Sequence, residues 1–192
     1  MRMSKQMTIR DISGFCPEEA IWKMIADVSE CLLNDGVGNG LSPDSVIVDG
    51  NSFMVNRIQD IENEFHAPEH KDDQLSDEKE EVWSLGAIAY YASTGHVVFG
   101  GHGGKYQKEH PLVSLPALPK RLHSLTPLLQ KCLCYDSKER IGLEVLNDLA
   151  RKGLEECGKQ SRNRIMSANG KEKKENGVKY TGEKWPEEMI EL

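Results

Sequence analysis

The sequence predicts a mainly α-helical domain that packs around one buried central helix and carries a small β-hairpin. The central helix is predicted by EEVWSLGAIAYYAST, residues 80–94, because it has apolar residues on nearly every side and only a helix buried all round tolerates that pattern. The hairpin is predicted by two short β-branched runs on either side of DGNS, residues 49–52. At 192 residues the chain has room for one ordinary domain and a tail.

The first long helix is predicted within CPEEAIWKMIADVSECLLNDG, residues 16–36. Pro17 and the two glutamates after it suit the first turn of a helix, and Gly36 suits the position just beyond its end. Apolar side chains recur at helical spacing along this stretch, which marks a face that packs on a core. They are Ile21, Ile25, Val28 and Leu32.

The rest of the domain alternates loops with two further helices. Residues 59–79 are polar and are predicted to be mostly loop, while residues 95–120 hold glycines and prolines between modest apolar stretches, which predicts a long irregular segment. Helices are predicted within LTPLLQKCLCYD, residues 125–136, and IGLEVLNDLARKGLEE, residues 141–156.

Residues 7–157 are therefore predicted to form one domain, and residues 158–192 a polar, disordered tail without apolar periodicity. The last residues, KWPEEMIEL, form a short amphipathic piece that includes Trp185. Two roles for this end remain open. It is either a terminus that stays mobile or packs back on the domain, or a segment that docks on a partner.

Composition and charge exclude several classes of partner and site. The net charge of −7 argues against nucleic acid and against an anionic membrane. No apolar run approaches the ~20 residues that cross a bilayer, and the first residues lack the apolar stretch of a signal peptide, so we expect a cytoplasmic protein. Five cysteines without a CxxC pair indicate neither a disulfide framework nor a zinc site, and no metal is expected.

Three motifs of the predicted domain resemble motifs of protein kinases. FHAPE, residues 65–69, resembles the end of a kinase activation segment, and EVWSLG, residues 81–86, resembles the DxWSxG start of the buried kinase helix. CLCYDSKERIGLEVL, residues 132–146, resembles the last conserved kinase segment. The matching residues are Ala67, Pro68 and Glu69 of the APE motif, Trp83, Ser84 and Gly86 of the helix motif with Glu81 in place of its aspartate, and Arg140 of the last segment.

These motifs occur in the order found in the C-terminal lobe of the eukaryotic-type protein kinase fold, which the chain resembles over roughly residues 7–156. The resemblance implies a helical lobe, with the hairpin on the face where the nucleotide-binding lobe docks. It also implies a buried structural ion pair between Glu69 and Arg140, because an arginine at this position closes on the APE glutamate in the family. The alternative is an unrelated helical protein in which short motifs occur by accident.

A kinase transfers phosphate with a specific set of groups. They are a nucleotide-binding lobe with a glycine-rich loop and a lysine, an aspartate that accepts the hydroxyl proton, and an asparagine and a second aspartate that hold magnesium. The nucleotide-binding lobe would stand before the first long helix. Only sixteen residues precede Pro17, so we expect that lobe to be absent.

The catalytic loop of kinases is matched by GNGLSPDSVIV, residues 38–48, in which the leucine and the proline fix the register to HRDLKPxN. The catalytic aspartate then falls on Gly40, the lysine on Ser42 and the metal-binding asparagine on Ser45. Glycine has no side chain to accept a proton, and serine is a poor neutral substitute for an amide that holds magnesium. The first DFG position falls near Arg57, a cation where magnesium requires a carboxylate, although a shift of one to three residues would place Asp60 there.

These substitutions favour a catalytically inactive protein-interaction or scaffold module. KIND domains, which are non-catalytic kinase C-lobe modules, are similar in lacking the first lobe and the catalytic residues, and an independently decayed kinase is the other possibility. A lobe without its partner lobe exposes apolar surface that a second protein can cover. We expect another protein as the partner, of unknown identity, and no cofactor. The predicted interaction surface consists of Trp22, Val37, Val46, Val48, Phe53, Val55 and Trp185.

Two other functional interpretations remain open. One is Ser/Thr-type protein kinase activity or ATP binding, retained in an atypical form or completed by a lobe from another chain, with Asp44, Asp49 or Asp60 in unusual roles. Mg-ATP would then be the cofactor. The other is a truncated product without function, for which a poorly packed body is expected. The sequence does not indicate an oligomeric state.

Overall fold

The computed structural model describes residues 6–38, 40–56, 62–71 and 74–175. Arg57, Asp60 and Trp185, which the sequence singles out, lie outside these residues. The chain divides into two units, Met1–Cys157 and Gly158–Leu192. The hydrophobic core belongs to the first unit.

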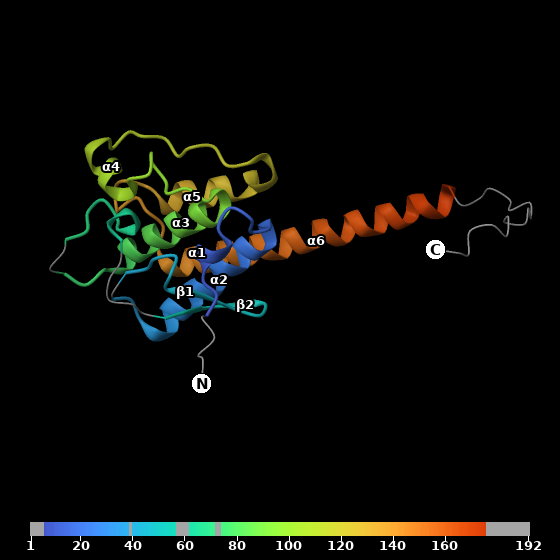
Figure 1. Ribbon diagram of the computed structural model, residues 1–192, viewed down its shortest axis with the longest axis horizontal. Coiled ribbons are helices and arrows are strands. Elements are labelled where there is room, and N and C mark those ends of the chain that lie inside the picture. The colour runs from blue at the N-terminus through green and yellow to red at the C-terminus, as the bar shows by residue number, and fades with distance from the viewer. Residues whose placement is uncertain (1–5, 39, 57–61, 72–73, 176–192) are drawn as a thin grey trace, which may run out of the picture. The chain divides into compact units, whose positions relative to one another are not determined.

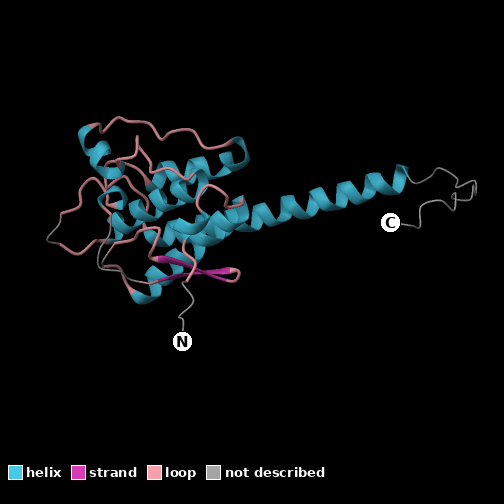
Figure 2. Ribbon diagram, in the orientation of Figure 1, coloured by secondary structure: helices cyan, strands magenta, loops and turns pink. Residues whose placement is uncertain are grey.

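The described part of the chain is mainly helical, with one two-stranded antiparallel hairpin (Figure 2). This much of the predicted fold class is confirmed. None of the described helices is long and apolar enough to cross a membrane. In chain order the elements are α1 (Ile9–Ile12), α2 (Glu18–Asp35), β1 (Val46–Asp49), β2 (Ser52–Val55), the 3-10 helix η1 (Asn63–Phe65), α3 (Glu78–Thr94), α4 (Gly103–Glu109), the 3-10 helix η2 (Lys120–Leu125), α5 (Thr126–Cys132) and α6 (Leu143–Glu175).

Helix α3 is the central helix, with α5 on one side and α1 and α2 on the other (Figure 1). Every residue from position 81 to position 90 is buried. The carboxylate of Asp77 caps the first turn by accepting a hydrogen bond from the N–H of Glu80 at 2.9 Å. Gly95 ends the helix in the left-handed conformation, at φ 75°. The all-round apolar pattern therefore reflects burial on every side.

The hairpin packs one face against α2. Val46 lies opposite Val55, and Val48 lies opposite Phe53, so these four side chains share that face. The carboxylate of Asp27 on α2 accepts a hydrogen bond from the N–H of Phe53 at 3.0 Å. The first and longest predicted helix thus holds the hairpin through both apolar contact and a polar bond.

Helix α4 lies inside the segment that the sequence predicts to be irregular. Its first residues pack directly on backbone: a Cβ on Gly103 would lie 1.8 Å from the carbonyl oxygen of Glu64, and a Cβ on Gly104 would lie 2.1 Å from that of His66. Glycine is a weak helix former, so this sequence signals a loop. The helix forms here because the two glycines allow this close contact. Apolar periodicity in the sequence does not reveal such a contact.

Helix α6 extends beyond the predicted end of the domain. Residues 158–175 are helical, where the sequence predicts a disordered tail, so that prediction is corrected for these positions. The expectation followed the loss of apolar periodicity after Cys157. Such periodicity reports contact with a core, whereas lysine, glutamate, glutamine and arginine favour helix by intrinsic propensity. The pattern marks the end of the apolar stripe and not the end of the helix.

Three residues of the predicted interaction surface are buried in the core of the domain, which corrects that prediction. Trp22, Val46 and Phe53 are 7%, 0% and 7% exposed. The Trp22 ring lies against Gly153 of α6, where a Cβ would come within 2.5 Å of the ring. An inward-facing helix stripe or strand face is apolar for the same reason as a docking surface, so the sequence does not separate the two.

The other described members of the predicted surface are more accessible. Val37, just after α2, is 38% exposed, while Val48 and Val55 are half-buried. Further apolar side chains that the sequence did not single out are also exposed: Met7 at 52%, Leu33 at 43% and Met54 at 46%.

We expect Gly153→Ala to lower the free energy of unfolding by about 1–3 kcal/mol, because the new methyl group would overlap the ring of Trp22. The matched change Gly158→Ala lies in the same helix and meets no atom within 4 Å. It is expected to raise the free energy of unfolding by up to about 1 kcal/mol or leave it unchanged. Urea denaturation measures both values. Equal values would show that Trp22 does not need the space above Gly153.

Candidate functional site

The loop that resembles the catalytic loop of kinases turns back on itself. The hydroxyl of Ser45 donates a hydrogen bond to the carbonyl of Ser42 at 2.8 Å and accepts one from the N–H of Ser42 at 3.0 Å. Ser42 and Ser45 are 1% and 0% exposed, and the Ser42 hydroxyl has no hydrogen-bond partner among the described residues. Gly40 lies at φ 75°, a left-handed conformation that glycine adopts without strain. At these three positions the loop offers two buried hydroxyls and no carboxylate.

Glu81 fixes the start of this loop to α3. Its Oε1 accepts a hydrogen bond from the N–H of Gly38 at 2.5 Å, and the residue is only 1% exposed. The carbonyl of Gly38 accepts a further hydrogen bond from the N–H of Ser76, at 2.6 Å. Both polar groups of Gly38 are therefore held by residues at or before the start of α3.

Arg10 of α1 binds two acidic side chains from different segments. Its Nε lies 2.7 Å from Oδ2 of Asp44, which belongs to the loop that contains Ser42 and Ser45. One of its terminal nitrogens lies 2.6 Å from Oε2 of Glu62. Its guanidinium also lies over the ring of Tyr91, 5.9 Å from the ring centroid. Burial alone would lower the pKa of Arg10, but the hydrogen bonds and charges of Glu62 and Asp44 raise it above its ordinary value. Arg10 therefore stays charged.

The segment around Arg10 is also joined to the hairpin by backbone contacts. The N–H of Val48 donates to the carbonyl of Met7 at 2.9 Å, and Thr8 forms an antiparallel bridge with Ile47. Ile9 is 1% exposed, so its side chain belongs to the core. Residues 7–12 thus cover the edge of β1 that β2 leaves free, and Arg10 ties the same segment to the loop beside it.

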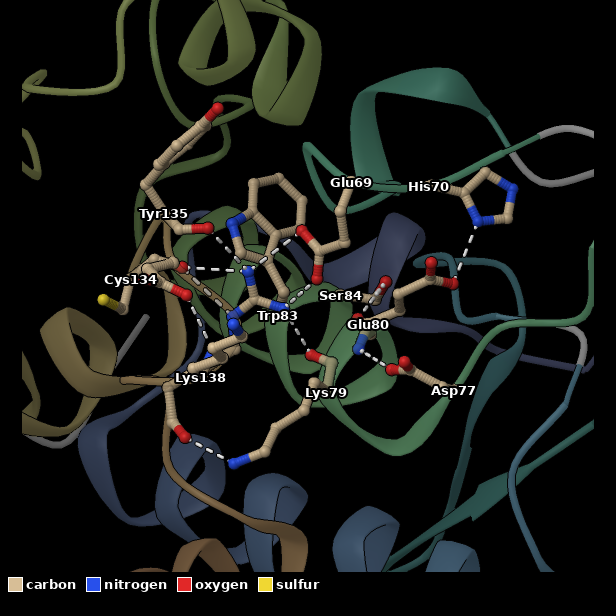
Figure 3. Close-up of polar contacts among 12 residues, drawn as sticks. Glu69, His70, Asp77, Lys79, Glu80, Trp83, Ser84, Cys134, Tyr135 and Lys138 are labelled. Atoms are coloured by element: carbon tan, nitrogen blue, oxygen red, sulfur yellow. Dashed lines mark hydrogen bonds and ion pairs between the residues drawn. The ribbon is translucent and has the colours of Figure 1, made fainter.

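Arg140 forms a second network with Glu69, Lys79 and Cys134, which are labelled in Figure 3. One terminal nitrogen lies 2.5 Å from Oε1 of Glu69, and the other lies 3.1 Å from Oε2. The guanidinium also donates to the carbonyl of Lys79 at 2.7 Å and to that of Cys134 at 2.9 Å. The side chain of Arg140 is 0% exposed and that of Glu69 is 31% exposed, so the arginine is buried and the carboxylate reaches solvent.

Trp83 and Ser84 connect α3 to two other segments, and both are labelled in Figure 3. The indole N–H of Trp83 donates to Oε1 of Gln107 at 2.8 Å, and the amide of Gln107 donates to the carbonyl of Leu133 at 2.7 Å. The hydroxyl of Ser84 donates to the carbonyl of Phe65 at 2.7 Å, directly before the APE motif. We interpret these hydrogen bonds as structural, since they join α3 to the backbone at Phe65 and, through Gln107, at Leu133.

The remaining motif residues are packing positions. Ala67 and Pro68 are buried. Gly86 lets α3 approach α5 closely, because a Cβ there would lie 2.6 Å from the Cβ of Cys132. Burial raises the pKa of the Cys132 thiol to about 12, so this thiol is protonated at neutral pH. It is therefore not a reactive nucleophile.

Histidines next to the APE motif form a structural contact. The rings of His66 and His70 stack with centroids 3.9 Å apart, and Nδ1 of His70 lies 3.0 Å from Oε2 of Glu80 (Figure 3). In the part of the chain that the structure describes, no group of three histidine, cysteine, aspartate or glutamate side chains could hold a metal ion. The contact joins the APE loop to the first turn of α3.

Sequence reasoning missed three residues that the structure brings into these networks. Arg10 and Glu62 lie in polar stretches without periodicity, and their pairing joins positions 52 residues apart. Gln107 lies in the segment predicted to be irregular, yet it is 2% exposed and bonded at both ends of its amide. No local signal in the sequence identifies any of the three, because each is defined by a distant partner.

Comparison with known proteins points in one direction. No protein-family model matches the chain. Over 133 residues, which are 65% of this chain, it is 27% identical to the dual specificity protein kinase Ttk of Danio rerio. The chain is distantly similar to a protein kinase. The match spans only 13% of that kinase, so it concerns a small part of the relative's length.

Arg140→Met is expected to lower the free energy of unfolding by about 3–5 kcal/mol, because Glu69 and the carbonyls of Lys79 and Cys134 would lose a fully buried donor. Glu69→Gln is expected to cost less, about 1–3 kcal/mol, since its carboxylate is 31% exposed. Chemical denaturation of the purified chain measures both.

The control for these variants is Glu30→Gln. Glu30 pairs with Arg151 at 2.8 Å, and both side chains are about half exposed, at 51% and 50%. A change within about 0.5 kcal/mol is expected for such a surface pair. If Arg140→Met cost no more than this control, the network around Arg140 would contribute nothing to stability.

A double-mutant cycle of Arg10→Met and Asp44→Asn is expected to give a coupling energy of about 0.5–1 kcal/mol, because the two side chains are 33% and 46% exposed and the pair is partly screened. The coupling should decrease in 1 M salt. A coupling energy near zero would mean that the pair with Asp44 does not help to hold residues 7–12, which would then be held by their backbone pairing, by Ile9 and by the pair of Arg10 with Glu62.

Proposed function

We propose that this chain is a kinase-like C-terminal lobe that is catalytically inactive and acts as a protein-interaction or scaffold module. The observation that carries the proposal is the ion pair between Arg10 and Asp44, at 2.7 Å. Asp44 is the one carboxylate within the loop at residues 40–45. A carboxylate that is bound to a guanidinium is a poor ligand for magnesium, because the positive charge opposes that of the metal ion.

Three positions in the same loop support this interpretation. The resemblance places the catalytic aspartate on Gly40, the lysine on Ser42 and the metal-binding asparagine on Ser45. Glycine offers no group, and both serine hydroxyls are buried, one of them used to close the turn. A phosphoryl-transfer site needs charged groups aimed at the nucleotide, and these residues supply none.

Two observations support the kinase-like part of the proposal. Glu69 and Arg140, which the resemblance pairs, lie within 2.5 Å of each other. The sequence similarity to a dual specificity protein kinase covers 65% of the chain. Both origins of such a lobe, as a relative of KIND domains or as an independently decayed kinase, are compatible with a binding role.

The interaction surface in this proposal consists of exposed apolar side chains on three neighbouring segments of the chain's first half. Val37 is 38% exposed, Leu33 43%, Met54 46% and Met7 52%. Val48 and Val55 belong to the proposed border of this surface. Apolar side chains of this size cost free energy in water and gain it when a partner covers them. The proposed partner is another protein, and no cofactor takes part.

The alternative function is protein kinase activity in an atypical form, or completed by a nucleotide-binding lobe from another chain. The similarity to a dual specificity protein kinase favours it. In that case Mg-ATP is the cofactor, and Asp44 or Asp49 takes an unusual role. Arg10 would have to release Asp44 before that residue could bind a metal ion.

We expect Mg-ATP to leave the thermal unfolding midpoint of the chain unchanged. A ligand at 100 times its dissociation constant stabilises the native state by ~2.7 kcal/mol, which a thermal-shift titration detects readily. The same titration on Arg10→Met, with and without magnesium, is the matched control because it frees Asp44. A saturable, magnesium-dependent shift of the unmodified chain, or transfer of the γ-phosphate to a protein substrate, would overturn the proposal.

A further inference from the structure

The segment that joins α4 to η2 presents a second accessible surface, in addition to the apolar surface that includes Met54. Residues 115–121, which we call the proline segment, have the sequence LPALPKR. Pro116 and Pro119 are three residues apart, which is the spacing of PxxP motifs that partners recognise in the polyproline II conformation. This spacing is common, so its significance depends on the conformation, the exposure and the charge of the segment.

The backbone of the proline segment is extended up to the start of η2. Residues 113–119 contain no helix, strand, turn or bend, and Figure 1 shows them in the long loop between α4 and α5. Pro119 has φ −52° and ψ 143°, close to the polyproline II values of about −75° and +145°. The N–H groups of residues 114, 115 and 117 form no hydrogen bond with another described residue. A polyproline II segment likewise has no internal hydrogen bonds and leaves its backbone to water.

One edge of the proline segment packs on the domain, and the other two are accessible. A polyproline II helix has three residues per turn, so Leu115 and Leu118 share one edge and the two prolines share the next. Leu118 is 4% exposed and Leu115 is half-buried, so their edge anchors the segment to the core. Pro119 and Ala117 are exposed, and Pro116 is half-buried. A partner therefore reaches the proline edge while Leu118 stays in the core.

Two cations without an acidic partner follow the second proline. Lys120 and Arg121 are exposed, and neither forms an ion pair with another described residue. Arg121 donates hydrogen bonds to two neutral acceptors, the carbonyl of Cys16 at 2.9 Å and that of Gly14 at 3.2 Å. In a chain with a net charge of −7, these adjacent positive charges favour a partner whose contact surface is acidic.

The same two hydrogen bonds place an exposed aromatic residue beside the proline segment. They hold the residues on either side of Phe15, which is 89% exposed. Burial of such a ring by a partner is favourable, and neighbouring exposed apolar side chains mark sites of association. Phe15, Ala117 and Pro119 therefore supply apolar contact area next to the two cations.

Modules that recognise polyproline II segments bind them in grooves lined by aromatic side chains, because the segment is already extended and loses little entropy. A groove of this kind with an acidic rim complements both the proline edge and the two cations. We propose that the proline segment binds the aromatic, acid-rimmed groove of a polyproline-recognition domain in another protein. This inference rests on the proposed interaction function and adds the class of partner.

The test measures binding of the full chain to a panel of immobilised SH3, WW and EVH1 domains by surface plasmon resonance. The panel includes domains with acidic and domains with basic groove rims. At least one acid-rimmed domain is expected to bind saturably, and about fivefold or more tighter than the basic-rimmed domains. Absence of saturable binding, or equal binding to acidic and basic rims, would overturn the proposal.

Two proline substitutions in the same loop test the location. Pro119→Ala removes one ring from the proline edge and is expected to weaken binding about fivefold or more. Pro111→Ala makes the same change at an exposed residue outside the proline segment and is expected to leave binding unchanged. Thermal unfolding of both variants checks that the domain stays folded. Equal effects of the two variants on binding would exclude the proline segment as the contact.

Two charge reversals test the acidic rim. Lys120→Glu places a negative charge against the rim and is expected to weaken binding about tenfold. Lys108→Glu makes the same change at an exposed lysine of α4 and is expected to have little effect. The difference between the two variants is expected to decrease in 1 M salt. Equally tight binding of both variants contradicts an acidic rim.

The outcomes separate this inference from the proposed function. If no domain of the panel binds and Mg-ATP gives no thermal shift, this inference alone is overturned, and the surface that includes Met54 remains the proposed site of interaction. A thermal shift with transfer of the γ-phosphate overturns the proposed function itself.

Discussion

The hydrogen bonds and ion pair of the buried Arg140 guanidinium are the interactions on which the rest of the domain depends. It binds Glu69 of the APE loop, the carbonyl of Lys79 at the start of α3 and the carbonyl of Cys134 after α5. A charge with a side-chain exposure of 0% is tolerated only when all of its donors are used. Burial of the arginine therefore requires that these three segments stay together.

The position of α3 follows from this network, and other contacts follow from the position of α3. Once its first turn is fixed, Glu81 meets the N–H of Gly38 and holds the loop before β1. One turn further on, the hydroxyl of Ser84 meets the carbonyl of Phe65. The surrounding loops are therefore hydrogen-bonded to α3. The apolar residues of α3 between these bonds belong to the core.

The sequence predicts the helices and strands along which apolar side chains recur at a regular spacing. It does not predict the contacts that join residues far apart in the chain. Helix α2, the hairpin and α3 were predicted because apolar side chains recur along them or surround them. The sequence does not distinguish an outward from an inward tryptophan, so the burial of Trp22 becomes evident only from the position of Gly153 against its ring. Arg10 gave no signal at all, since its partners stand 34 and 52 residues away.

Close packing at α4 has a consequence for the local unfolding of the domain. Gly103 and Gly104 have carbonyl oxygens of Glu64 and His66 where side chains would stand, so α4 and the loop before the APE motif share one boundary without side chains between them. Helix α4 and this loop cannot separate by the rotation of a side chain. Water therefore reaches the backbone of both segments at once or of neither. Their backbone amides should therefore exchange with solvent as one cooperative unit, although they lie far apart in the sequence. Local unfolding of this loop is thereby joined to the melting of a helix.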